Sequence, residues 1–197
     1  MRNFSKITLS VLLVASAAFT SCSDDDPKPE PVEESIYTRL GGTKMVPDDG
    51  EGNEGQMIEA GRLAFRKVVN STVGLIVADV EANASGNLSA HFAPLLTEVG
   101  AGNTTKVAVL VDNLTDFFSF NTGGTNPVNT YSGLNMVDAH DPAKNPRMGT
   151  KSSDADYTKF VGYVGAAANT NGVPSSSQLY KDIVVVLQSL RAPIVQK

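Results

Sequence analysis

The sequence predicts an all-α domain. Apolar residues recur at steps of three and four positions in several long segments, as they do on the buried face of an amphipathic helix. Stretches rich in glycine and asparagine, such as Asn83–Leu88 and Gly123-Gly124, separate these segments. The run Ile183–Leu187 has the composition of a strand, but helical patterns flank it and no second run could pair with it. We therefore expect helices joined by turns.

Two helices are predicted in the first half of the domain. The first runs from Met57 to Val80, where apolar residues from Ile58 to Val80 follow the helical period. The second follows Thr104, a residue type that often caps a helix N-terminus, and it ends at the glycine pair Gly123-Gly124. Two further helices are predicted in the second half.

The third helix begins at Ser153, because Asp156 stands three residues later and the two form the spacing of a capping box. It stops at Asn171–Pro174, a sequence that breaks helices. The last helix begins near Ser175–Ser177 and carries the apolar run that contains Ile183–Leu187. The domain is thus expected to be helical to its end.

Composition excludes several classes of function. The chain of 197 residues has 41% hydrophobic and 19% charged residues, which is typical of a globular protein. It carries 16 Lys and Arg against 21 Asp and Glu, a net charge of −5, without a basic cluster, so we expect no nucleic-acid partner. We find no paired carboxylates, metal-ligand cluster or Cys/His pair in a catalytic context. Gly42–Lys44 lacks the upstream glycine of a P-loop. The sequence favours a binding protein over an enzyme.

The first 22 residues predict export and a lipid anchor. Arg2 and Lys6 precede a short apolar stretch, and small residues precede Cys22, the single cysteine. Phe19–Cys22 resembles a bacterial lipoprotein processing site, and Ser23–Asp26 resembles the acidic export tag of surface lipoproteins in the Bacteroidetes group. The resemblance implies lipid attachment at Cys22 and an outer-membrane lipoprotein of the cell envelope, with surface exposure left open. The alternative is an ordinary secretory signal with a buried thiol.

Three regions follow from these features. Residues 1–21 are the predicted signal peptide, residues 22–34 the acylated cysteine and an acidic, Pro-rich flexible tether, and residues 35–197 the helical domain. The domain has three long predicted loops of undetermined role, and the first of them is acidic and not expected to order by itself. These loops are Pro47–Gly55, Thr97–Thr104 and Asp141–Ser152.

Two segments almost a hundred residues apart suggest a family. Ser35–Gly42 ends in a glycine pair, and Tyr131–His140 combines Tyr-Ser-Gly with Met136 and one of the two histidines of the chain. In this order they resemble the truncated haemoglobins, group I above all, and the resemblance implies a truncated globin-like helical fold. Further similar segments are Val68–Asp79, Leu88–Phe92, Leu110–Gly124, Tyr157–Pro174 and Ala192–Val195.

The resemblance implies a haem b cofactor whose iron is bound by His140. Met136 and Val137 would contact the porphyrin beside that histidine, and Phe92 would stack on the opposite side. Tyr131 would donate a hydrogen bond to a propionate, although a solvent-facing turn tyrosine is an equal alternative. The aromatic residues are equally well explained as core residues. His91, the other histidine, is expected at the rim or on the surface.

The sequence departs from the family on the distal side of the haem. Where the family usually carries a tyrosine and often a glutamine, this chain has Val73 and Leu114, with Leu110 one turn before the latter. Phe117 and Phe118 stand for the paired phenylalanines of the distal helix. Without donors, bound oxygen would lose hydrogen bonds worth about 1–3 kcal/mol and leave quickly. We expect five-coordinate ferrous iron.

The predicted function is therefore haem binding, with oxygen or another diatomic gas as ligand. Two alternatives use the same helices differently. A haem-free protein could act through its loops as an interaction module for an unidentified protein partner, and a haem-capture protein would load the cofactor reversibly at the same histidine.

Overall fold

The computed structural model describes residues 33–197, and residues 34–197 form one compact unit. The predicted signal peptide, the predicted attachment site Cys22 and residues 22–32 of the predicted tether lie outside the described residues. The statements below concern the described part of the chain.

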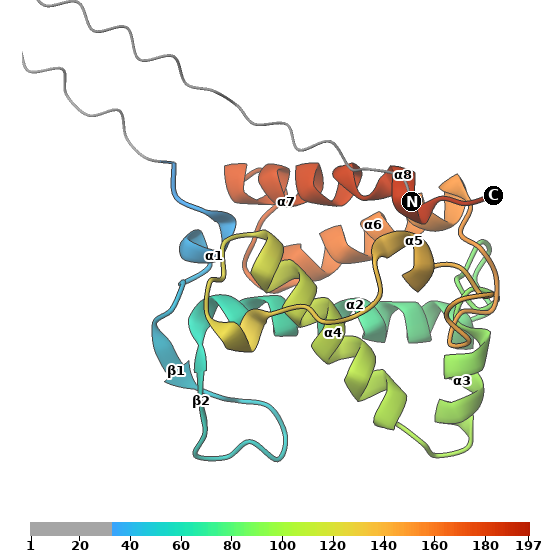
Figure 1. Ribbon diagram of the computed structural model, residues 1–197, viewed down its shortest axis with the longest axis horizontal. Coiled ribbons are helices and arrows are strands. Elements are labelled where there is room, and N and C mark those ends of the chain that lie inside the picture. Colours follow the sequence, from blue (N-terminus) through green and yellow to red (C-terminus); the bar gives the residue numbers. More distant parts are fainter. Residues whose placement is uncertain (1–32) are drawn as a thin grey trace, which may run out of the picture. The chain divides into compact units, whose positions relative to one another are not determined.

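The unit is mostly helical, which confirms the all-α class at this level (Figure 1). The 3-10 turn η1 lies at Pro127–Asn129. The α-helices are α1 (Ile36–Arg39), α2 (Ala60–Glu81), α3 (Ala93–Gly100), α4 (Thr105–Asn121), α5 (Met136–Ala139), α6 (Asp154–Thr170), α7 (Gln178–Ser189) and α8 (Arg191–Ile194).

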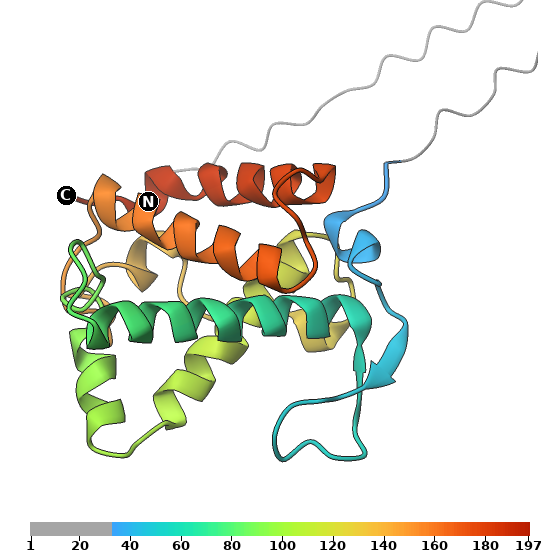
Figure 2. The same ribbon diagram turned by 180° about the vertical axis from the view of Figure 1, so that it is seen from behind.

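Helix α2 is the centre of the packing. It runs beside α6, α4 crosses it, and α7 lies along the far side of α6 (Figures 1 and 2). The apolar stripe predicted from the sequence supplies the buried face of α2, and side chains of α1, α4, α6 and α7 meet it. The buried residues of this core are Tyr37, Phe65, Val69, Phe118, Val164 and Leu187.

The prediction that the first long helix begins at Met57 is wrong. Met57–Glu59 is strand β2, and it pairs antiparallel with β1 (Met45–Pro47), so α2 begins only at Ala60. The loop between the strands, expected not to order by itself, is held by Arg66 of α2, whose guanidinium donates to both carboxylate oxygens of Asp48. A partner 18 positions away in sequence therefore orders this loop, and such a partner has no local signal.

The second predicted loop, Thr97–Thr104, is also corrected, because helix α3 extends through Gly100. The predicted helix starts at Ser153 and near Ser177 are confirmed. Ser153 and Asp156 form the reciprocal capping box at the start of α6, and the Ser177 hydroxyl accepts from the amide of Tyr180 at the start of α7. Thr104 precedes α4 without a side-chain cap. The residues around each N-terminus therefore determine where α6 and α7 begin.

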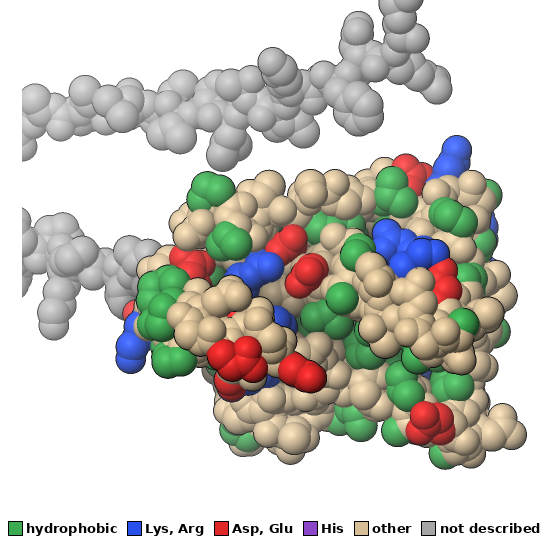
Figure 3. Space-filling view, turned by 90° about the horizontal axis from the view of Figure 1, so that it is seen from below, with side chains coloured by type: hydrophobic (Ala, Val, Ile, Leu, Met, Phe, Trp, Pro, Cys, Tyr) green, Lys and Arg blue, Asp and Glu red, His purple; other side chains and the backbone are tan. Residues whose placement is uncertain are grey.

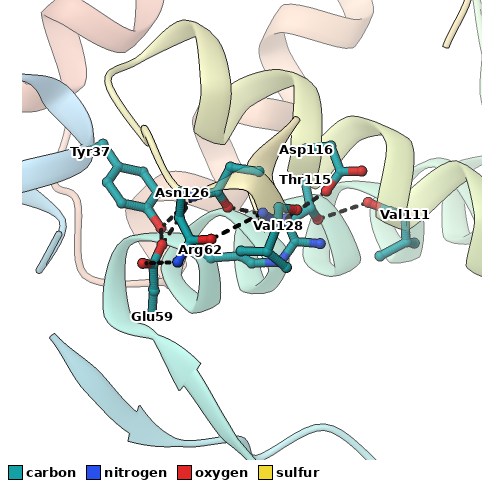
Figure 4. A network of polar contacts seen from close by, with 9 residues as sticks. Tyr37, Glu59, Arg62, Val111, Thr115, Asp116, Asn126 and Val128 are labelled. Carbon is teal, nitrogen blue, oxygen red and sulfur yellow. Dashed lines mark hydrogen bonds and ion pairs between the residues drawn. The ribbon is translucent and has the colours of Figure 1, made fainter. Parts of the chain in front are cut away.

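A buried polar network joins β2, α1, α2 and η1 (Figure 4). The Tyr37 hydroxyl donates to Glu59, whose carboxylate also accepts from Asn126 (2.9 Å) and Asn129 (3.0 Å). Burial alone would raise the pKa of Glu59, but these hydrogen bonds and the charge of Arg62 outweigh it and lower that pKa. Burial, reinforced by Glu59, raises the pKa of Tyr37 to about 12, so the phenol keeps the proton it donates. The network therefore holds α1 against β2.

We expect the hairpin ion pair to make stability sensitive to acid. Hydrogen bonds from Arg66 lower the pKa of Asp48 from 3.8 to about 2. The unfolded chain therefore binds more protons between these values, and the stabilisation is complete above about pH 4 and lost as the pH falls towards 2. Asp48→Asn should lower the free energy of unfolding at pH 6, and its deficit against the wild type should shrink at pH 3 in urea denaturation.

The matched control is Asp49→Asn, because Asp49 pairs with Lys67 at the surface, where such pairs contribute little. It should leave the free energy of unfolding nearly unchanged at both pH values. A deficit of Asp48→Asn that stays constant between pH 6 and pH 3 would refute the assignment.

Charges of both signs are mixed with apolar side chains on the face of the described residues shown in Figure 3. Ion pairs connect helices of the domain: Arg39 of α1 pairs with Asp182 of α7, and Arg62 of α2 pairs with Asp116 of α4, each at 2.5 Å. Among residues 33–197, no helix combines the length and apolar character needed to cross a membrane.

Candidate functional site

A cavity of about 170 Å³ lies beside α4, between that helix, α3, α5, α6, α7 and the segment 145–152. One water needs only about 10–15 Å³, so the cavity has room for a much larger guest. Its wall is mostly apolar. The apolar lining residues include Leu88, Leu95, Leu134, Met148, Phe160, Leu187, Leu190 and Ile194 in addition to those predicted from the sequence.

His140 lies at the C-terminal end of α5 and lines the cavity. Its Nδ1 atom is 2.8 Å from the carbonyl oxygen of Met136, one turn earlier. Because a carbonyl only accepts, Nδ1 carries the proton and Nε2 keeps its lone pair. Burial lowers the pKa of His140, so the ring is neutral near pH 7. A neutral imidazole with an anchored Nδ1 is the form that binds a metal through Nε2.

His91 is buried, with 6% of its surface exposed, and it lines the same cavity. The expectation of a rim or surface position is therefore wrong. Its Nδ1 atom lies 2.9 Å from the carbonyl oxygen of Thr150, and the Ser152 hydroxyl lies 3.3 Å from both ring nitrogens. Burial first, and then the nearby His140, lower the pKa of His91 to about 4, so this ring is also neutral near pH 7.

The two imidazoles face one cavity from different segments of the chain. Their ring centroids are 6.2 Å apart and their planes differ by 17°. His91 also meets Phe92 edge-on, with ring centroids 5.0 Å apart. Moving a polar imidazole out of water costs free energy, so a buried imidazole normally makes hydrogen bonds or binds a ligand. The two histidines of the chain thus form a pair inside an apolar cavity.

Most of the residues predicted for the haem site lie around this cavity. Helix α4 contributes four of them in the order expected for one face, and Phe92 and Met136 come from the N-terminus of α3 and from α5. The predicted residues that line the cavity are Phe92, Leu110, Leu114, Phe117, Phe118, Tyr131, Met136 and His140.

Val73 and Val137 do not line the cavity, and Tyr131 lines it but makes a different hydrogen bond from the predicted one. Val73 is half-buried on α2, and no residue of that helix lines the cavity. Val137 is 51% exposed, because α5 turns Met136 and His140 inward. The Tyr131 hydroxyl donates to the carbonyl of Leu134 at 2.7 Å and packs edge-on against Phe117, so it is already satisfied within the chain.

Two cationic side chains, Lys106 and Arg147, also line the cavity. Lys106 pairs with Glu98, whereas Arg147 has no salt bridge within the described residues. Sequence reasoning missed Arg147 as well as His91. A half-buried guanidinium beside an apolar cavity is suited to the carboxylate of a guest.

The residues present fit a haem. The cavity offers apolar walls for a flat macrocycle, one imidazole with a free Nε2 for the iron, and Arg147 for an acidic side chain of the ring. A site for a bare metal ion is not indicated, because residues 33–197 contain no group of three or more His, Cys, Asp and Glu side chains that could hold one.

No protein-family model and no curated protein matches this chain.

Proposed function

We propose that this protein binds one haem b in the cavity, where His140 would bind the iron. The observation that carries the proposal is the state of His140, neutral, held through Nδ1 by the Met136 carbonyl, and directed into an apolar cavity. Among the described residues its Nε2 atom has no hydrogen-bond partner. The sequence resemblance to truncated haemoglobins gives independent support for the same residue.

The side chains around the cavity have separate roles in this proposal. Phe92 and Met136 line the cavity and would contact the macrocycle, and the wall formed by Leu110, Leu114 and Phe117 would exclude water from the site. Haem iron supplies reversible binding of diatomic gases and one-electron redox chemistry. Leu110, Leu114 and Phe117 offer no hydrogen-bond donor to a bound gas, and on α4 the cavity-lining donors are Asn113 and Lys106. With the predicted distal positions apolar, we propose transient gas binding or sensing rather than oxygen storage.

We propose that the protein works at the cell envelope, anchored through Cys22 and separated from the membrane by the acidic tether. The support for this placement is the sequence of residues 1–34 alone. The globin-like description of the helices is likewise a proposal, supported by the order of the matched segments.

The proposal is tested by haem transfer. Full-length protein loaded with one equivalent of haem should transfer it to an excess of apomyoglobin slowly, over hours, because the bond to His140 and buried apolar contacts must be lost. Transfer within seconds would instead support the capture alternative. Failure to load haem at all would support the haem-free interaction module.

Arg147→Ala should weaken haem binding about two- to fivefold, because one partly exposed ion pair with a propionate contributes about 0.5–1 kcal/mol. The loss should shrink at 1 M NaCl, where such pairs are screened. Lys144→Ala is the control, since Lys144 is an exposed cation three residues away that does not line the cavity. Equal effects of the two substitutions would remove Arg147 from the proposed site.

A further inference from the structure

We propose that the segment after α8, Val195–Lys197, positions His140 by holding α5 from outside the cavity, and that Gln196 is the positioning residue. We call this segment the strap. The inference rests on the proposed haem function and adds to it a residue that no motif of the sequence indicates. Gln196 does not line the cavity, so its side chain would act on a guest only through α5.

Helix α5 depends on support from the rest of the fold. It consists of Met136–Ala139, a single turn, and an isolated helix of this length is not stable in water. The Asn135 side chain caps its N-terminus by accepting from the amide of Asp138, and α5 packs against α8 (Figures 1 and 2). The position of His140, at the C-terminal end of α5, is therefore set by contacts outside the helix.

The strap makes one of these contacts at the last turn of α5. The side-chain amide of Gln196 donates to the carbonyl oxygen of Val137 at 2.7 Å, and the same oxygen accepts from the backbone amide of His140 at 3.3 Å. A second carbonyl, that of Pro193, lies 3.4 Å from the same side-chain nitrogen. Because carbonyls only accept, the amide nitrogen of Gln196 must face them. Gln196 therefore binds the carbonyl group that closes the turn before His140.

The backbone of the strap is fixed to the buried residue Ser152. Val195 and Ser152 form a parallel β-bridge, and the Ser152 carbonyl accepts from the backbone amides of Gln196 (2.9 Å) and Lys197 (3.3 Å). The Lys197 ammonium group also lies 3.8 Å from the carboxylate of Asp156 in α6. The strap thus connects α5 to the start of α6, one of the long helices of the core.

The part of the cavity lining that the strap supports is the part with the least regular structure. The segment 131–152 contributes lining residues that include His140 and Arg147, and within this segment α5 is the longest helix. It should open more readily than the long helices α4, α6 and α7, which also line the cavity. Loss of the bond between Gln196 and Val137 would raise the population of this open state and speed the release of a guest.

The test compares Gln196→Glu with the wild type in two measurements. The substitution keeps the size of the side chain but places a carboxylate oxygen where the donating nitrogen faces the Val137 carbonyl. In haem-free full-length protein, hydrogen exchange of residues 136–152 should become about fivefold faster, because one hydrogen bond is lost. In haem-loaded full-length protein, transfer of haem to apomyoglobin should become faster by a similar factor, about fivefold.

Two control variants separate positioning from general stabilisation. Gln188→Glu makes the same chemical change at an exposed glutamine whose side chain contacts Arg191 instead of α5, so it should behave as the wild type. Asn129→Ala removes hydrogen bonds to Tyr37 and Glu59, which a local opening of residues 136–152 does not break. It should destabilise the domain and still leave exchange of residues 136–152 and haem transfer at wild-type rates.

Unchanged hydrogen exchange of residues 136–152 in Gln196→Glu would overturn the hold of the strap on α5. Faster exchange together with a wild-type rate of haem transfer would overturn the positioning of His140 through that hold. A wild type that binds no haem would reject the proposed function itself, and the hydrogen exchange of the haem-free variants would still decide whether Gln196 holds α5.

Discussion

His140→Ala is expected to weaken haem binding by at least about 100-fold. Changes to groups that only orient a metal ligand already reduce metal affinity about 10- to 100-fold, and this substitution removes the ligand itself. His91 remains, but its ring already contacts the Ser152 hydroxyl and the Thr150 carbonyl within the chain. The measurement is a titration of the variant with haem, followed at the Soret band.

The matched control is Val137→Ala, because Val137 lies in the same single turn of helix and is 51% exposed. It should bind haem as the wild type does. Both variants should keep the helical circular dichroism of the wild type, which shows that a lost Soret band reports a lost ligand. A wild-type affinity and spectrum in His140→Ala would refute the role of His140.

Asn129→Ala is expected to lower the free energy of unfolding by about 3 kcal/mol. The Asn129 side chain is fully buried and donates to Tyr37 (3.1 Å) and Glu59 (3.0 Å), while its oxygen accepts from Arg62 (3.2 Å). Removing it leaves the Glu59 carboxylate with fewer donors in a site that water does not reach, and partly unpaired buried charges are costly. Urea denaturation measures the loss.

Asn121→Ala is the control for this prediction, since Asn121 is exposed and its amide donates only to the Phe117 carbonyl in the same helix. Its cost should stay below about 1 kcal/mol. Equal losses of the free energy of unfolding in the two variants would show that the buried network stabilises the fold no more than one exposed hydrogen bond does. The network does not line the cavity, so Asn129→Ala that still folds should bind haem normally.

The helices could be predicted from the sequence because their signals are local. The stripe through Phe65, Val69 and Ile76 repeats with the helical period, and the capping box at Ser153 lies within four residues. The hairpin could not be predicted in this way. Its strands have three residues each, and the loop is ordered by the contact of Asp48 with Arg66.

The site shows the same division between local and distant signals. Met136 and His140 share a face at a spacing of four residues, which the sequence displays directly. The position of His91 depends on hydrogen bonds from a segment about sixty residues later, at Gly149 and Thr150, so no local pattern reveals its burial. Val73 is assigned to the site by the resemblance alone. It does not belong to the buried stripe of α2, and no residue of α2 lines the cavity.

The account depends most directly on whether the wild-type cavity takes up haem in a fixed ratio. We predict that titrating the purified full-length protein with haem gives a Soret band that saturates at one equivalent. A titration without saturation, with a spectrum no different from that of free haem, would contradict the account.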